Sequence, residues 1–314
     1  MIWSPSSIAN QHPILIVCII AIIVHGAFWL QLVFCLSVRQ RSMQWIYAYL
    51  ITDILLLFRF FFVYIIHTTS NQCPSNEIWA LFVCYFEATI DNYLNVLEVY
   101  ILLALNICRY MQIVYNRNVY IKDIKFLFFA HLIIYLLPLI TLIIQSLIGW
   151  AELKHFVDDL CDIRYTNIYA KIFNTIIFFA LPIVLNIIVI SMSVRHVQIT
   201  SRMRRSQHYI SAREKYHRSL VIQFLCFYII WLGLWSPNVV VYQFTTGSSS
   251  LTMNARLISF IEIALDPFII GALDIRFWRA WKSIWIKFKC LQIQERQIQP
   301  VVRKGSEKQH ETPV

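Results

Sequence analysis

Ionisable and amide side chains recur along one face of an apolar stretch that starts near residue 79. On an α-helix, with 100° per residue, Asp91, Asn95, Glu98 and Arg109 fall within an arc of roughly 60°. Asp91 and Arg109 would lie roughly 27 Å apart along the axis, close to the thickness of a bilayer's hydrocarbon core. Ionisable groups at membrane depth are costly unless they face protein or water, so this face predicts a functional interior.

The composition around this face is that of a membrane protein. The 314-residue chain is 59% apolar and 14% charged, with a mean hydropathy of +0.61, which is too apolar for a soluble domain of this size. A helix needs about 20 apolar residues to span a bilayer. Seven stretches are long enough, at residues 14–37, 46–66, 79–107, 126–150, 168–194, 219–244 and 255–273. We therefore expect one helical domain over residues 1–290 and a cytoplasmic tail over residues 291–314.

Lysine and arginine are divided unequally between the connections on the two sides of the membrane. One side carries 21 of them, whereas the other has only Lys154, Arg164, Lys171 and Arg256. Because basic connections stay in the cytoplasm, we expect an extracellular N-terminus in a multi-pass protein of the plasma membrane. Contact of the basic segments with anionic lipid explains the net charge of +10, so no nucleic-acid partner is expected.

Cysteines and a basic segment mark the two membrane surfaces. Cys73, Cys84 and Cys161 fall on the outer, oxidising side, where a disulfide can persist. On the inner side, "RFWRAWKSIWIKFKC" alternates basic and apolar residues at helical spacing, which predicts a short amphipathic helix after the seventh span. Cys290 ends this segment and is either a palmitoylation site or a free thiol.

Motifs in five of the spans, and a phenylalanine after the seventh, resemble those of one receptor family. The third span ends in Cys108-Arg109-Tyr110, where the family has an Asp/Glu-Arg-Tyr triplet, and Cys84 stands at the family spacing of 25 residues before that arginine. The other matching residues are Asp53 in "LITDILL", Pro182 in "FFALPIV", Trp235 and Pro237 in "LWSP", Asp266 and Pro267 in "LDPFII", and Phe277. Over residues 14–290 the chain resembles a divergent rhodopsin-like G-protein-coupled receptor.

The resemblance implies an all-α, seven-transmembrane helix bundle that passes extracellular ligand binding to a cytoplasmic heterotrimeric G protein. It implies a disulfide between Cys84 and Cys161, with Cys73 as the competing partner. The implied activation switch comprises Arg109, Tyr110, Trp235, Pro237, Asp266 and Pro267. The implied ligand-binding residues are Asp91, Asn95, Asn238, Tyr242 and Arg256. A cationic amine would pair with Asp91, but Asn238 and Val239 replace the aromatic pair usual in amine receptors, so a peptide or another polar small molecule is favoured.

The chain also departs from the family pattern. The first span lacks the family's asparagine, the fourth has no tryptophan before Pro138, and Ile270 replaces an inward-facing tyrosine. Cys108 replaces the acid that would pair with Arg109 in a resting-state ionic lock. We therefore expect raised basal activity.

Four acids are expected at the interior cation site of such a bundle. Asp53 is joined there by Glu98, and Glu262 and Asp266 lie on one face of the seventh span with i, i+4 spacing. Converging carboxylates in a low dielectric repel by several kcal/mol, so they must share protons or a bound cation, such as sodium at Asp53. The alternative is that protonated carboxyls serve only as hydrogen-bonding core residues. No other metal and no cofactor are expected.

Other classes of membrane protein fit less well. A retinal pigment needs a lysine in the seventh span, and residues 255–273 contain none. An iron-dependent membrane enzyme needs clustered histidines, whereas the nine here are scattered, so no enzymatic activity is expected. A transporter that couples cations or protons through the buried acids remains the alternative, although the spans show no inverted repeat.

Overall fold

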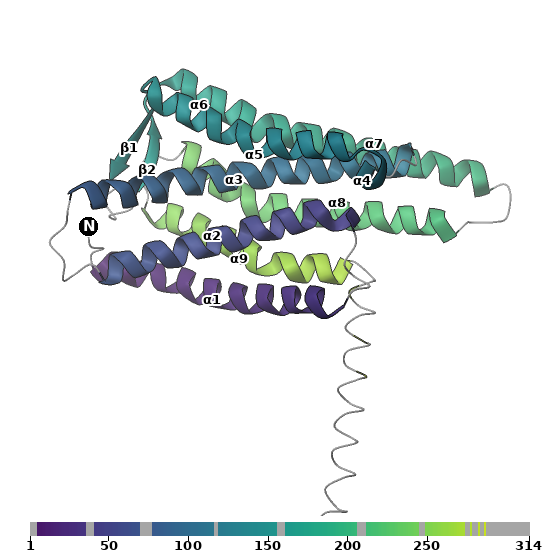
Figure 1. Cartoon of the computed structure of the whole chain (residues 1–314), viewed down its shortest axis with the longest axis horizontal. Coiled ribbons are helices and arrows are strands. Elements are labelled where there is room, and N and C mark those ends of the chain that lie inside the picture. Colours follow the sequence, from purple (N-terminus) through teal and green to yellow (C-terminus); the bar gives the residue numbers. More distant parts are fainter. Residues whose placement is uncertain are drawn as a thin grey trace, which may run out of the picture.

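The chain folds into long helices that run side by side, with a small strand pair at one end (Figure 1). The architecture comes from a computed structural model that describes residues 5–35, 41–69, 77–115, 119–155, 161–205, 212–244 and 249–273, and residues 277, 282 and 286. The elements are α1 (Pro5–Phe34), η1 (Arg41–Met43), α2 (Gln44–Thr69), α3 (Glu77–Val114), α4 (Val119–Lys122), α5 (Ile124–Leu147), β1 (Ala151–His155), β2 (Cys161–Tyr165), α6 (Ile168–Asn174), η3 (Thr175–Ala180), α7 (Leu181–Arg205), α8 (Ala212–Phe244) and α9 (Ser249–Leu273).

These elements form seven rods, as the sequence predicts. The fifth rod consists of α6, η3 and α7 in direct succession, and η3 is a π-helical segment immediately before Leu181-Pro182. Six helices are long and apolar enough to cross a membrane. The protein is therefore an all-α, multi-pass membrane protein.

The seventh rod, α9, is not among those six because of its charged side chains. It carries Arg256, Glu262 and Asp266 within 25 residues. Its place in the bundle comes from packing against α1 and α8, and Ile263 and Phe260 belong to the central hydrophobic core. Burial of both charged side chains of the inner half, Glu262 and Asp266, lets this helix lie at membrane depth.

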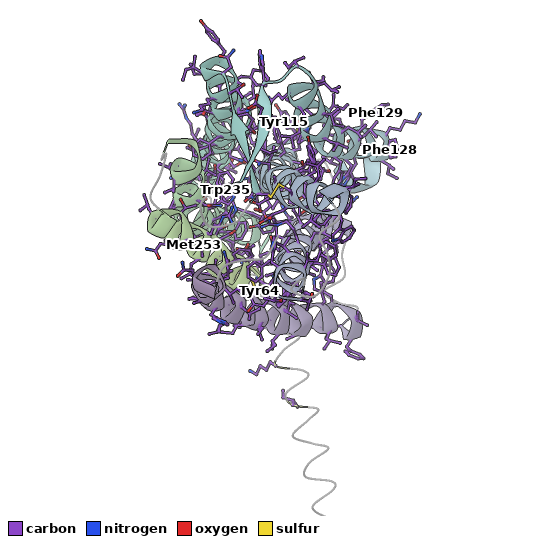
Figure 2. All side chains as sticks on the ribbon, turned by 90° about the vertical axis from the view of Figure 1, so that its left-hand side faces the viewer. Tyr64, Tyr115, Phe128, Phe129, Trp235 and Met253 are labelled. Atoms are coloured by element: carbon purple, nitrogen blue, oxygen red, sulfur yellow. A yellow bond between two sulfur atoms is a disulfide. The ribbon has the colours of Figure 1, made fainter. Side chains whose placement is uncertain are left out.

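Helix α3 lies at the centre of the bundle. It contacts α2, α5, α7 and the strand pair, and two-thirds of its apolar window is buried. Helix α5 lies at the edge, where Phe128 and Phe129 are 65% and 59% exposed and project outward in the end-on view of Figure 2. An apolar surface of this kind suits lipid, because lipid removes the cost of exposing it to water.

The connection from α5 to the fifth rod forms an antiparallel strand pair, which the sequence did not indicate. β1 and β2 pair from Ala151 opposite Tyr165 to His155 opposite Cys161. Gly149 precedes the pair with φ +72°, a conformation that glycine adopts without a Cβ clash. We call this pair the hairpin and the end of the bundle that carries it the hairpin end.

Aromatic contacts join α2 to α5, the helix that lacks the family's tryptophan. Trp45 of α2 is fully buried and stacks on His131 of α5, with ring centroids 3.9 Å apart. His131 also shares a 2.9 Å hydrogen bond with Gln44. The indole that joins these helices therefore comes from α2.

The predicted amphipathic helix after α9, Cys290 and the tail over residues 291–314 lie outside the described residues, except for residues 277, 282 and 286. Phe277 is fully buried and stacks on Phe28 of α1 at 4.8 Å. Its carbonyl accepts a 3.2 Å hydrogen bond from Gln31 Nε2. Phe277 therefore joins the segment after α9 to the first helix.

Candidate functional site

An ion pair joins α2 to α3 near the hairpin end. Arg59 Nη2 lies 2.6 Å from Asp91 Oδ1, and the two side chains are 9% and 21% exposed. Arg59 Nη1 also donates to the Glu87 carbonyl at 3.4 Å. Sequence analysis did not identify Arg59 as the partner of Asp91. Arg59 takes this place because two turns of α2 beyond Asp53 bring it opposite Asp91 rather than back toward the acids.

Two adjoining cavities lie beside this ion pair. They share four lining residues, all predicted to bind ligand: Asp91, Asn95, Asn238 and Arg256. One cavity reaches α1 and α2, with Gln11, Arg59 and Ser259 in its wall. The other reaches β2, the fifth rod and α8, with Tyr165, Asn174, Phe179 and Trp235 in its wall. Tyr242, also predicted to bind ligand, belongs to α8, but its side chain is outside the described part of the structure.

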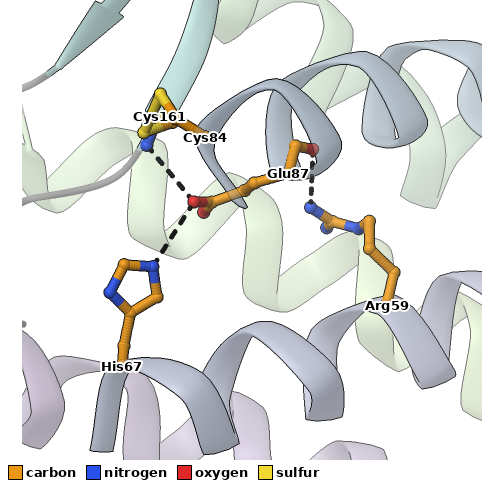
Figure 3. Close-up of a disulfide and its surroundings, with 5 residues drawn as sticks. All are labelled: Arg59, His67, Cys84, Glu87 and Cys161. Carbon is orange, nitrogen blue, oxygen red and sulfur yellow. Dashed lines mark hydrogen bonds and ion pairs between the residues drawn. A yellow bond between two sulfur atoms is a disulfide. The ribbon is translucent and has the colours of Figure 1, made fainter. Parts of the chain in front are cut away.

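A disulfide and a buried carboxylate fix the hairpin to α3. Cys84 of α3 is bonded to Cys161 of β2, which confirms the predicted pairing, whereas Cys73 falls outside the described residues. Figure 3 shows Glu87, one turn after Cys84, extending between β2 and α2. Its Oε2 accepts from the Cys161 backbone N–H at 3.4 Å and lies 3.7 Å from His67 Nε2. Sequence reasoning missed Glu87 and His67, although a carboxylate three residues after a disulfide cysteine was a signal that could have found Glu87.

The four acids predicted to meet do converge in the middle of the bundle. Asp53, Glu98, Glu262 and Asp266 are each at most 1% exposed. They interact electrostatically with one another, and Tyr49 of α2 joins them. The Tyr49 hydroxyl lies 2.8 Å from Glu262 Oε1 and 2.5 Å from Asp266 Oδ2. A hydroxyl donates a single hydrogen, so two simultaneous hydrogen bonds require that one of these carboxyls carries a proton.

A histidine of α1 completes this acid cluster. His25 is 2% exposed, and its Nε2 lies 3.0 Å from the Ile263 carbonyl of α9 and 4.0 Å from Asp53 Oδ2. Only a protonated Nε2 can donate to a carbonyl, so this nitrogen carries the hydrogen. Sequence reasoning noted only that α1 lacks the family's asparagine. It did not recognise that His25 could bridge α2 and α9 from that helix.

Arg109 lies at the other end of α3 and is 4% exposed. It donates to Gln112 Oε1 at 3.1 Å and to the Ser42 carbonyl at 3.3 Å. It lines a small hollow with Tyr49, Leu102 and Ile270. We call this end of the bundle the Arg109 end. Tyr110, the next residue of the triplet, points elsewhere and packs edge-on against Tyr115 at 5.9 Å.

Cys108 occupies the position of the family's acid, and its thiol lies near the Arg109 charge and two uncharged side chains. Its thiol interacts with the indole of Trp45 and the hydroxyl of Tyr120 in α4. Burial raises the pKa of Tyr120, so its hydroxyl stays protonated. The position is therefore filled by uncharged groups that dock α4 onto α2 and α3.

A stack of aromatic rings along α8 connects the cavity beside Asp91 to the middle of the bundle. Trp235 packs on Phe179 of η3 at 5.7 Å and on Trp231 at 4.8 Å, and Trp231 packs on Tyr228 at 5.6 Å. Pro237 interrupts the backbone donors of α8 just above Trp235, and Pro267 does so in α9 next to Asp266. Both proline positions can bend their helices.

The arrangement of these rods matches a solved structure. The crystal structure of squid rhodopsin superposes with a TM-score of 0.68 over 90% of this chain and 82% of that chain. The chain has the rhodopsin fold. The sequence identity to squid rhodopsin is 16%, so the match establishes the fold, and no protein-family model or curated protein matches the sequence. The seven-helix resemblance predicted from scattered motifs is thus confirmed as a rhodopsin fold.

Proposed function

We propose that the protein is a G-protein-coupled receptor of the plasma membrane, with the hairpin end outside the cell and the Arg109 end inside. The observation that carries this proposal is the separation of Asp91 and Arg109 along the central helix α3, with Asp91 beside the cavities and Arg109 buried at the Arg109 end. The basic connections at the Arg109 end support this orientation. A heterotrimeric G protein is the proposed cytoplasmic partner.

The proposed ligand is a peptide or a polar small molecule. Asn95, Asn238 and Arg256 offer amide and guanidinium groups in both cavities. Asp91 already has the Arg59 guanidinium at 2.6 Å, so an ammonium ligand would have to compete with an existing charge-assisted contact. This geometry disfavours the amine-binding role considered for Asp91.

In the proposed mechanism, ligand binding biases two packing states of the bundle. Trp235 lines the cavity and also contacts Trp231, so a ligand that moves the Trp235 ring also moves the stack below it. Bending of α8 at Pro237 would carry its cytoplasmic half away from α3 and expose Arg109 to the G protein. The acid cluster around Asp53 would hold protons or a cation such as sodium, and the number held would differ between the two states.

A transporter is the competing function, because buried carboxyls also suit a cation pathway. The two functions are separated by measuring ligand-free recruitment and activation of purified G proteins and, in parallel, proton and sodium flux in proteoliposomes. We expect G-protein activation without flux. Flux that is lost in Glu98→Gln, with no activation of any G protein, would overturn the receptor function.

A further inference from the structure

An aromatic ring of α8 covers the guanidinium of Arg109. The Cζ atom of Arg109 lies 5.0 Å from the centroid of the Phe224 ring, which is within the range of a cation–π contact. Arg109 is 4% exposed, so the contact is largely shielded from water. Cation–π contacts gain strength when they are desolvated. The ring of Phe224 is therefore positioned to stabilise the buried charge.

The same ring belongs to an apolar cluster that joins three helices. Phe224 packs with Ile113 of α3, Val194 and Val197 of α7, and Val221 of α8. Movement of the lower part of α8 away from α3 would separate the ring from Arg109 and from this cluster at the same time. The contact thus exists only while α8 stays close to α3.

The position before Arg109 cannot supply a negative charge to hold this arginine. It is Cys108, whose thiol faces the indole of Trp45 and the hydroxyl of Tyr120. Gln112 Oε1 and the Ser42 carbonyl accept hydrogen bonds from Arg109, but both are uncharged. Both belong to elements on the α2–α3 side of the bundle rather than to α8. The ring of Phe224 gives the charged group of Arg109 a contact with α8.

We propose that Phe224 is the resting-state lock of this receptor, a cation–π contact that holds α8 against Arg109 where a carboxylate is missing. The inference rests on the proposed function and specifies how that function is restrained. Opening of α8 breaks the contact and exposes the guanidinium that engages the G protein. The replacement of the family's acid by Cys108 predicts raised basal activity. The contact with Phe224 keeps basal activity below that level.

Two measurements test the lock in the full-length receptor in lipid nanodiscs. The first is basal G-protein activation. The second is the emission of an environment-sensitive fluorophore on Cys226, which is exposed on α8 two residues after Phe224. In this background Cys35, Cys73 and Cys290 are replaced by serine. The label reports movement of α8 without any G protein.

We expect Phe224→Leu, which keeps an apolar side chain but removes the ring, to raise basal activation about five-fold and to shift the emission of the label. Phe224→Tyr keeps the ring and should restore both signals toward those of the parent. Val221→Ala trims the same apolar cluster one turn away, keeps the ring, and should change both signals little.

The outcomes separate the lock from the proposed function. If Phe224→Leu leaves the label unchanged, or if Val221→Ala shifts it as much as Phe224→Leu does, the ring does not restrain α8 through Arg109 and the lock is wrong. If Phe224→Leu shifts the label and Phe224→Tyr restores it, the lock is supported. A label shift in Phe224→Leu without G-protein activation in any variant supports the lock and contradicts the proposed function.

Discussion

The guanidinium of Arg59 and the carboxylate of Asp91 form an ion pair at 2.6 Å that joins α2 to α3 beside the cavities. Removing one partner of a largely buried pair leaves the other charge uncompensated. We expect Asp91→Asn and Arg59→Gln each to destabilise the receptor by about 2 kcal/mol. The double variant should lose at least about 1 kcal/mol less than the sum of the two. Thermal inactivation in detergent measures each value, and strict additivity would show that the two side chains do not interact.

The same pair makes a prediction about ligands. Once an agonist is known, its potency in Asp91→Asn, corrected for surface expression, should stay within about ten-fold of the parent, because the carboxylate already serves Arg59. Arg256→Gln should weaken the agonist more, since Arg256 lines both cavities as Asp91 does but is not part of the Arg59–Asp91 ion pair. If only Asp91→Asn lost potency, by a hundred-fold or more, the result would support direct contact between Asp91 and an ammonium group of the agonist.

The disulfide between Cys84 and Cys161 is expected to be required for stable expression. The bond closes a loop across a sequence separation of 77 residues, and loss of a native disulfide typically costs about 2–4 kcal/mol. Cys84→Ser and Cys161→Ser should therefore both reduce surface expression, while Cys73→Ser should not. Peptide mapping under non-reducing conditions provides the direct check, and a peptide joining Cys73 to Cys161 would show that the assignment is wrong.

Arg109→Ala should leave surface expression largely intact and abolish activation of the G protein. Arg109 contacts Gln112, the Ser42 carbonyl and the Phe224 ring in the closed bundle, but in the proposed mechanism the partner it needs for signalling, the G protein, binds it only in the open state. Activation of purified G protein, normalised to the surface level of each variant, measures the effect. Unchanged activation would contradict the role assigned to this arginine.

The acid cluster predicts that signalling depends on pH. In the closed state, the two Tyr49 contacts require a proton on Glu262 or Asp266, so this state binds at least one proton that a hydrated, open cluster can release. Raising the pH therefore destabilises the closed state, and basal activation should rise by up to about ten-fold per pH unit for each proton released. Assays between about pH 5.5 and 8.5 test this expectation.

The matched control for the pH experiment is Glu98→Gln, which removes one acid from the cluster and keeps its shape. This variant should flatten the pH profile and reduce any effect of sodium, because fewer negative charges remain to be neutralised. Flat and superimposable profiles for the parent and Glu98→Gln would leave the four carboxyls as hydrogen-bonding residues of the core.

Much of the fold was predictable from sequence because membrane spans are read from length and apolarity alone. The convergence of Asp53 and Glu98 followed from helical spacing combined with motif positions. What could not be predicted were the contacts made by long or ambiguous side chains. Arg59 could have turned toward the acids or toward lipid, and only the packing of α2 against α3 decides that it reaches Asp91.

Other missed features depend on backbone geometry or on relations between distant helices. No periodicity in the segment between α5 and α6 distinguished a strand pair from a loop, because its register is set by the disulfide and by Glu87. His25 is an isolated polar residue in an apolar helix. Its neighbours in the sequence do not indicate that it lies next to Asp53 and the Ile263 carbonyl, which belong to other helices.

The charges of α9 have a consequence for how the protein is made. A charged side chain near the centre of a helix opposes insertion by the translocon by about 2.5–3.5 kcal/mol, and the central part of α9 carries Glu262 and Asp266. Tyr49 of α2 and His25 of α1 contact the side chains or backbone of this segment, and both are synthesised long before it. We therefore expect α9 to insert stably into the bilayer only when α1 and α2 are already there to pair with its polar groups.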